Sequence, residues 1–84
     1  MAEYKIILVK VEKRTDSAPE VQKILTDYGC NIKVRLGLHD TVDSNSCSSS
    51  GLIFLEVSGD EAGIATMADR LNKLNGVSAK YLKI

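Results

Sequence analysis

The chain has 84 residues, of which 44% are hydrophobic and 26% charged, and eleven basic and eleven acidic residues give a formal net charge of zero. This composition is typical of a folded globular domain, and the length allows one domain with a thin core that self-association would enlarge. Zero net charge supplies no field to attract nucleic acid, and no apolar run reaches the roughly 18 residues of a membrane span. Residues 1–5 carry no signal-peptide pattern. We therefore expect a single domain over residues 1–84 that is cytoplasmic and binds neither nucleic acid nor membrane.

The first predicted strand runs from Glu3 to Val11, is rich in β-branched residues and is apolar on both faces. A helix is predicted next, because Ser17-Ala18-Pro19-Glu20 offers a serine cap, a proline tolerated in the first turn and a glutamate three residues after the cap. Gly29 is expected to cap its C-terminus. The apolar stripe of this helix comprises Val21, Ile24, Leu25 and Tyr28.

A second strand is predicted from about Cys30 to Leu38, where apolar and polar residues alternate. One face is polar and basic, as expected of a strand near the edge of a sheet. Cys30 is predicted to be a small buried hydrophobe. The alternation predicts a core face made of Ile32, Val34, Leu36 and Leu38.

Residues 39–50 form a long serine-rich loop in this interpretation, and Gly51 to Val57 follows as a strand with Glu56 as its one charged residue. A strand so apolar on both faces belongs in the middle of a sheet. Ser58-Gly59-Asp60-Glu61 repeats the serine and glutamate cap, Asn75-Gly76 closes the helix, and Val77 to Ile84 is the last predicted strand. The second helical stripe comprises Ile64, Met67, Ala68, Leu71 and Leu74.

The element order β-α-β-β-α-β predicts a ferredoxin-like α+β sandwich, in which a four-stranded antiparallel sheet carries both helices on one face. The two helical stripes can cover that face only. Alternate residues of the first and third strands remain apolar with nothing in this chain to cover them, and such a patch marks an interface. The sequence therefore predicts a homo-oligomer, a dimer or a tetramer, assembled through the open face of the sheet.

Catalysis and nucleic-acid binding find little support in the residues. The third strand has one aromatic residue, Phe54, and no lysine or arginine, unlike sheets that stack bases. The only histidine, His39, lies beside the serine-rich loop, without the rigid support that a catalytic base needs. We expect a protein that is not an enzyme and has no cofactor or metal site. The alternative is a metal- or redox-responsive module in which His39 and Cys47 of neighbouring subunits act together.

A small-molecule site is the remaining possibility. The turn Thr15-Asp16-Ser17 precedes a helix, where backbone amides and hydroxyls can hold a small anion such as a carboxylate. Arg35 on the polar face of the second strand could add a bidentate contact. The alternative is that Ser17 only caps the helix and that Arg35 is a solvated edge charge.

Several stretches are similar to known regulatory proteins. Asp16 to Ile32, which ends in Tyr28-Gly29-Cys30-Asn31-Ile32, resembles the first half of an ACT-type regulatory domain. Ile32 to Gly37, Leu52 to Val57 and Leu71 to Lys80 resemble the small stand-alone iron-only hydrogenase system regulators. The resemblance spans nearly the whole chain, and its motifs are short and mostly structural.

The resemblance implies an ACT-like fold, shared with the C-terminal domain of the nickel-responsive repressor, and oligomers assembled through the sheet. It also implies a small effector, often an amino acid in ACT domains, and a possible protein partner, because the chain has no segment that reads DNA. Two features differ from the relatives: Glu20 follows Pro19 where ACT domains usually have glycine, and only His39 is available where the repressor has a histidine cluster. The effector positions implied by the resemblance are Thr15, Asp16, Ser17 and Asn31.

Overall fold

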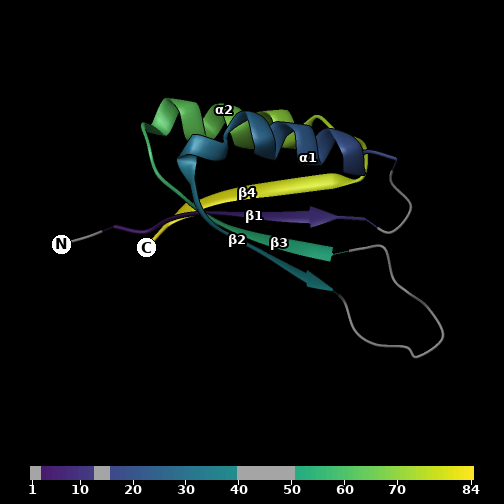
Figure 1. The fold of residues 1–84 in the computed structure, drawn as a ribbon, viewed down its shortest axis with the longest axis horizontal. Coiled ribbons are helices and arrows are strands. Elements are labelled where there is room, and N and C mark those ends of the chain that lie inside the picture. Colours follow the sequence, from purple (N-terminus) through teal and green to yellow (C-terminus); the bar gives the residue numbers. More distant parts are fainter. Residues whose placement is uncertain (1–2, 13–15, 40–50) are drawn as a thin grey trace.

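The computed structural model describes residues 3–12, 16–39 and 51–84. Its elements follow the predicted β-α-β-β-α-β order, and both helices lie on the same side of the sheet (Figure 1). The predicted ferredoxin-like α+β sandwich is confirmed. The elements are β1 (Lys5–Val11), α1 (Ala18–Asp27), a short 3-10 turn (Gly29–Asn31), β2 (Ile32–His39), β3 (Gly51–Val57), α2 (Glu61–Asn72) and β4 (Val77–Lys83).

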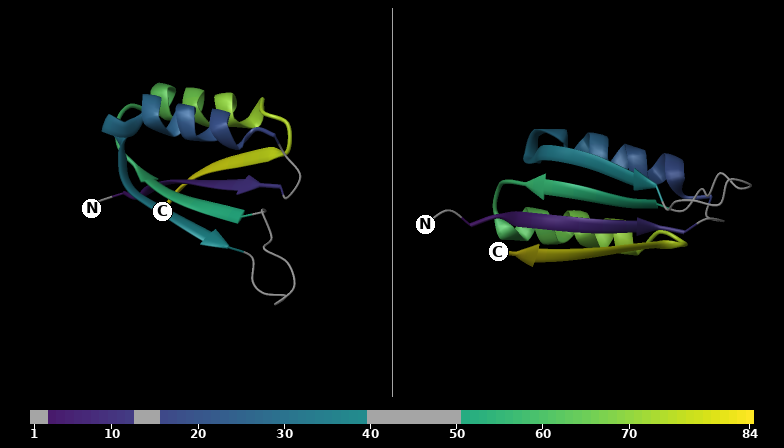
Figure 2. Two further views of the ribbon diagram at one scale, coloured as in Figure 1. Left: turned by 45° about the vertical axis from the view of Figure 1, so that its right-hand side comes forward. Right: turned by 90° about the horizontal axis from the view of Figure 1, so that it is seen from below.

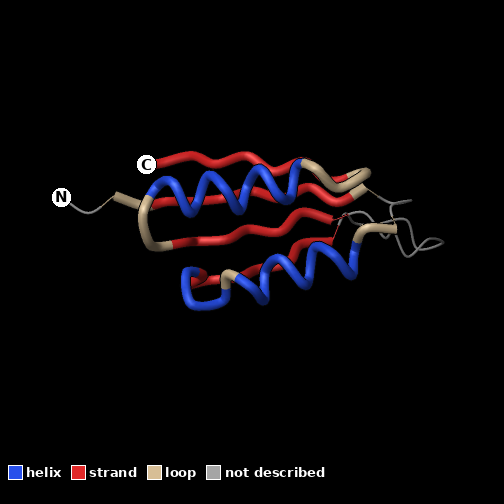
Figure 3. Tube along the Cα trace, turned by 90° about the horizontal axis from the view of Figure 1, so that it is seen from above, coloured by secondary structure: helices blue, strands red, loops and turns tan. Residues whose placement is uncertain are grey.

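The four strands are antiparallel and lie in the order β2-β3-β1-β4. β3 is therefore an inner strand and β2 an edge strand, as the sequence predicted for Gly51–Val57 and for the alternating strand before it. The sheet continues past β1 and β4, because Tyr4 and Ile84 exchange two backbone hydrogen bonds of 2.8 and 2.9 Å. Seen from above, the two helices run side by side along the sheet (Figure 3).

The hydrophobic core lies between the helices and the sheet. Ile7, Val9 and Leu55 are fully buried, and Leu55 is the cross-strand partner of Ile7. Most residues of the two predicted helical stripes meet them, and Tyr28 and Leu74 pack at the margin of the core. The buried helical residues are Val21, Ile24 and Leu25 of α1 and Ile64, Met67, Ala68 and Leu71 of α2.

The predicted core face of β2 is wrong beyond its first residue. A register irregularity between Ile32 and Val34 leaves Lys33 without a cross-strand partner, so the side chains after it lie on the opposite face from the one expected. Ile32 packs against the core, whereas Val34 and Leu36 are 43% and 51% exposed. The bulge thus moves apolar side chains of β2 to the face of the sheet that the helices do not cover.

Ser58 and Gly29 are not the caps predicted for their helix ends, whereas Ser17 is the N-cap of α1 as predicted. Asp60, and not Ser58, caps α2, because its carboxylate accepts a hydrogen bond of 3.0 Å from the Gly63 amide. Ser17 accepts the Val21 amide through its carbonyl, and its side chain makes no capping bond. Gly29 does not cap α1: the helix ends at Asp27, with Tyr28 as the C-terminal cap, and Gly29 opens the 3-10 turn.

Cys30 lies in that 3-10 turn and is exposed, so its predicted burial is wrong. Tyr28 is the last residue of the helical stripe that packs against the core. The 3-10 turn that follows places Cys30 on the surface. Among the described residues, no helix is long and apolar enough to cross a membrane.

Candidate functional site

The face of the sheet opposite the helices is the most unusual surface in the described structure. It is formed by the alternate residues of each strand that do not join the core, and we call it the outer face. No helix lies over it when the molecule is seen from below (Figure 2, right). Its apolar residues are Tyr4, Ile6, Leu8, Val34, Leu36, Leu52, Phe54, Leu82 and Ile84.

The cross-strand register places these residues in rows. Leu36 pairs with Phe54 and Phe54 with Leu8, so three apolar side chains from β2, β3 and β1 lie next to one another. Ile6 is 8% exposed although it does not belong to the core cluster, because its neighbours on the outer face cover it. Tyr4 and Ile84 extend the apolar surface toward the chain ends and are 54% and 73% exposed.

Charged residues lie toward the margins of this surface. Lys10 and Lys80 occupy outer-face positions of β1 and β4, and Glu56 lies on β3, where Lys33 approaches it at 3.9 Å. Both signs of charge are therefore present around an apolar centre. An apolar centre with a polar rim is the arrangement of protein interfaces.

The predicted small-molecule site does not converge within one chain. Thr15 lies outside the described residues; Asp16 and Ser17 precede α1, whereas Asn31 follows it. Because a helix rises about 1.5 Å per residue, the ten residues of α1 separate Asn31 from Ser17 by about 15 Å. A small molecule such as an amino acid is shorter than this distance, so it cannot contact both ends of α1 in one chain.

Asn31 has a structural role in the described fold. Its side-chain amide donates a hydrogen bond of 3.0 Å to the Ser58 carbonyl, and its own carbonyl accepts the Ser58 amide at 2.7 Å. These two bonds join the turn after α1 to the end of β3. Asn31 also lines a cavity of about 90 Å³ together with Tyr28, Asp60, Gly63, Ile64 and Met67.

Arg35 lies on the helix side of β2, because its cross-strand partner is Leu55 of the core face. Its guanidinium donates a hydrogen bond to the Gln22 side chain on α1. Arg35 therefore ties the edge strand to the first helix and is not merely a solvated edge charge. Its exposure still leaves room for a further contact.

The alternative site of His39 and Cys47 falls largely outside the described part of the chain. The backbone of His39 ends β2, its side chain is not described, and Cys47 lies in the undescribed 40–50 segment. Within residues 3–12, 16–39 and 51–84, no group of three or more histidine, cysteine or acidic side chains could hold a metal ion. The idea of a metal- or redox-responsive module stays a prediction.

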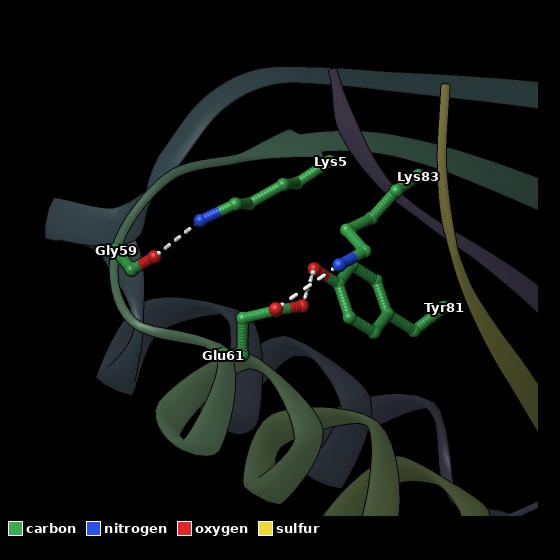
Figure 4. A network of polar contacts seen from close by, with 5 residues as sticks. All are labelled: Lys5, Gly59, Glu61, Tyr81 and Lys83. Carbon is green, nitrogen blue, oxygen red and sulfur yellow. Dashed lines mark hydrogen bonds and ion pairs between the residues drawn. The ribbon is translucent and has the colours of Figure 1, made fainter. Parts of the chain in front are cut away.

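A polar network that the sequence analysis missed joins β4 to α2 (Figure 4). The Glu61 carboxylate accepts hydrogen bonds from the Tyr81 hydroxyl at 2.9 Å and from Lys83 Nζ at 3.0 Å. These bonds, that of Lys83 first, lower the pKa of Glu61 below its ordinary value of 4.5, and the Glu61 carboxylate raises the pKa of Lys83 above 10.5. Nearby, Lys5 donates to the Gly59 carbonyl at 2.8 Å.

The network is a clamp, since each of its bonds holds one element against another. The spacing of Tyr81 and Lys83 on one strand face could have suggested it. The sequence does not reveal that the end of β4 lies beside the start of α2, and the network depends on that placement.

The fold is that of a small ferredoxin-like α+β domain. The apo form of the CPII protein of Thiomonas intermedia K12, a nitrogen regulatory PII-like protein, superposes with a TM-score of 0.59 at 10% identity, covering 99% of this chain and 90% of that one. The form of CPII bound to ADP, AMP and acetate superposes equally well, at 11% identity over 98% and 86% of the chains. At such identities the similarity shows the fold alone.

The chain belongs to the TM1266-like family, whose description reads "Iron-only hydrogenase system regulator, putative" and whose model matches residues 3–81. The resemblance to these regulators is thereby confirmed. The uncharacterized protein TM1266 of Thermotoga maritima has a similar structure, with a TM-score of 0.81 and 23% identity over 99% of both chains. No curated protein sequence matches the chain.

Proposed function

We propose that the protein is a non-enzymatic, cytoplasmic regulatory domain that forms a homo-oligomer through its outer face and acts on its target by contacting another protein. The membership in a regulator family supports the general class. The observation that carries the proposal is the exposed apolar surface formed by β2, β3 and β1, centred on Leu36, Phe54 and Leu8. Exposed apolar surface of this kind costs solubility in a monomer and is favourable only when a partner covers it.

A second copy of the chain is a suitable partner for this surface. We consider two copies packed outer face to outer face, with Leu8 and Phe54 at the centre and with their strands running in opposite directions. In this arrangement the Glu56 end of one copy lies over the Lys10 end of the other. The two apolar centres then face each other, and opposite charges approach at the rim. The formal net charge of zero adds no general repulsion between copies.

The size of the face sets the expected strength. Four strands spaced about 4.8 Å apart and seven residues long at about 3.4 Å per residue give a flat area of about 450 Å² per copy. A standard interface buries about 800 Å² per partner. The side-chain relief of the sheet increases the buried area, yet the interface stays at the small end, so the oligomer should dissociate on dilution.

We further propose that a small effector binds on the helix side of the molecule, either near Thr15, Asp16 and Ser17 before α1 or near Asn31 and Arg35 beyond it. The PII-like protein CPII, which has a similar fold, is bound to ADP, AMP and acetate in one structure. Its bound nucleotides and acetate are anions, so AMP and acetate are suitable first probes for this chain.

The test of assembly is the native mass of the protein over a range of concentrations. We expect a dimer or a tetramer for the wild type and a monomer for Leu36→Glu and Phe54→Glu, because a buried carboxylate without a partner is strongly unfavourable. Ala65→Glu, an exposed position on α2, is the matched control and should assemble normally. A wild type that is monomeric at high concentration, or a Phe54→Glu variant that stays assembled, would contradict the proposal.

A further inference from the structure

A groove lies between the two helices. It joins the first turns of α1 to the last turns of α2, because the two helices run in opposite directions (Figure 3). Its volume is about 300 Å³, and it is open to solvent along its length. Ile24 and Leu74 form its apolar floor, and the charged residues that line it are Glu20, Lys23, Arg70 and Lys73.

The charge at this groove is positive. Three of its four charged side chains are basic, whereas the whole chain has equal numbers of acidic and basic residues. Arg70 is held in place by Asp27 at 3.1 Å and lies 5.4 Å from the centre of the Tyr28 ring. Lys23 and Lys73 form no ion pair with any other described residue. Two basic side chains, Lys23 on α1 and Lys73 at the C-cap of α2, thus remain available beside an apolar floor.

We infer that this groove is the docking site for an acidic, amphipathic segment of the protein that the domain regulates. The inference rests on the proposed function, because an oligomer that covers the outer face leaves the helix layer as the surface turned toward other molecules. Leucine-like side chains of the segment would lie on Ile24 and Leu74, and its carboxylates would approach Lys23 and Lys73. Amphipathic helices are commonly recognised in this way, with their apolar face laid into a hydrophobic groove.

The surface is less suited to nucleic acid. Single-stranded nucleic acids bind where aromatic side chains stack with bases, and the one aromatic ring near the groove, Tyr28, already lies under Arg70. An RNA oligonucleotide is therefore the competing probe in the experiment below.

The experiment measures binding of a synthetic amphipathic helical peptide that has leucines on one face and glutamates beside them. We expect amide shifts in the NMR spectrum to gather at Lys23, Ile24, Lys73 and Leu74, and Lys23→Gln/Lys73→Gln to weaken binding about fivefold to tenfold, since each exposed ion pair contributes up to about 1 kcal/mol. Ala62→Glu/Ala65→Glu is the matched control: it changes the net charge by the same amount at the opposite end of α2 and should bind the peptide normally.

Several results would overturn the inference. These are no peptide binding by the wild type, equal binding of a peptide with alanine in place of leucine, shifts that map to the outer face, or RNA that binds the groove more tightly than the peptide. The native mass is recorded for each variant. Lys23→Gln/Lys73→Gln should form the same oligomer as the wild type and bind the peptide more weakly. Phe54→Glu should be a monomer and still bind the peptide. Failure of the docking site and failure of the oligomer are therefore separate results.

Discussion

The two faces of the sheet have similar sequences and different surroundings. Val9 and Leu8 are neighbours in β1, yet Val9 is fully buried under the helices and Leu8 is half-buried on the outer face. Leu55 and Leu52 of β3 show the same contrast, with exposures of 0% and 37%. The helix-covered face gives the chain its core, whereas the outer face adds apolar surface that a monomer does not need. This difference is the main support for the proposed contact with a partner.

The contrast between the faces is tested most directly by two leucines. Leu55→Ala should lower the free energy of unfolding by about 2–5 kcal/mol, because it leaves a cavity in the core. Leu36→Ala, on the outer face, should cost less than about 1 kcal/mol at a dilution where the protein is monomeric, since the side chain is 51% exposed there. Chemical denaturation at low and high protein concentration measures both. Equal losses for the two variants under dilute conditions would contradict the difference between the faces.

A second prediction concerns the connection that leads from β3 over the covered face to α2. Gly59 has a φ of 123°, and a Cβ added there would lie 2.6 Å from Asn31 Nδ2. Gly59→Ala should lower the free energy of unfolding by about 1–3 kcal/mol because of backbone strain. Gly29→Ala is the control: a Cβ there meets nothing within 4 Å, and we expect a change below about 1 kcal/mol. Neither variant should alter the oligomer at temperatures well below unfolding, and a change of native mass would be evidence against separate roles for the two faces.

Loss of the α2 cap should have a smaller effect on the covered face. Asp60→Ala removes the acceptor of the Gly63 amide and should cost about 1 kcal/mol, measured by thermal or chemical unfolding. Asp60→Asn keeps an oxygen acceptor and should cost clearly less. If the asparagine variant were as unstable as the alanine variant, the hydrogen bond would not be the source of the stability.

The smallest effect is expected from pH. The pKa of Glu61 is lowered in the folded state, so its contribution to stability is present above the ordinary value of 4.5 and is lost as pH falls through the folded-state pKa. The pKa of Lys83 is raised, so its contribution is present below 10.5 and is lost as pH rises through the folded-state pKa. Glu61→Gln should therefore make the free energy of unfolding less dependent on pH in both ranges. An unchanged pH profile would show that the clamp adds no stability.

Most of the fold could be predicted from the sequence. The helical stripes, the element order and the position of β2 at the edge of the sheet follow from periodicity, which reflects burial directly. The face of β2 could not be predicted, because one extra residue at Lys33 reverses every side chain after it and leaves the alternation unchanged. The same bulge changes the outer face: Val34 and Leu36, expected in the core, belong to it.

The candidate site was predicted less well than the fold. Local motifs indicated Ser17 and Arg35, and the structure gives Arg35 a partner on α1 that lies 13 residues earlier in the chain. The network of Glu61, Tyr81 and Lys83 and the groove between the helices depend on contacts between distant segments. Such contacts follow from the packing of the elements and leave no local pattern in the sequence.

The pairing of Tyr4 with Ile84 has a consequence for how the fold tolerates changes in connectivity. Because the two ends of the described chain are hydrogen-bonded neighbours, a short peptide could join them without displacing any strand. A circularly permuted chain opened at the Asn75-Gly76 turn would then begin with β4 and end with α2, and every contact of the core would be kept. The stability of this domain should depend on which faces its elements bury and very little on the order in which the chain visits them.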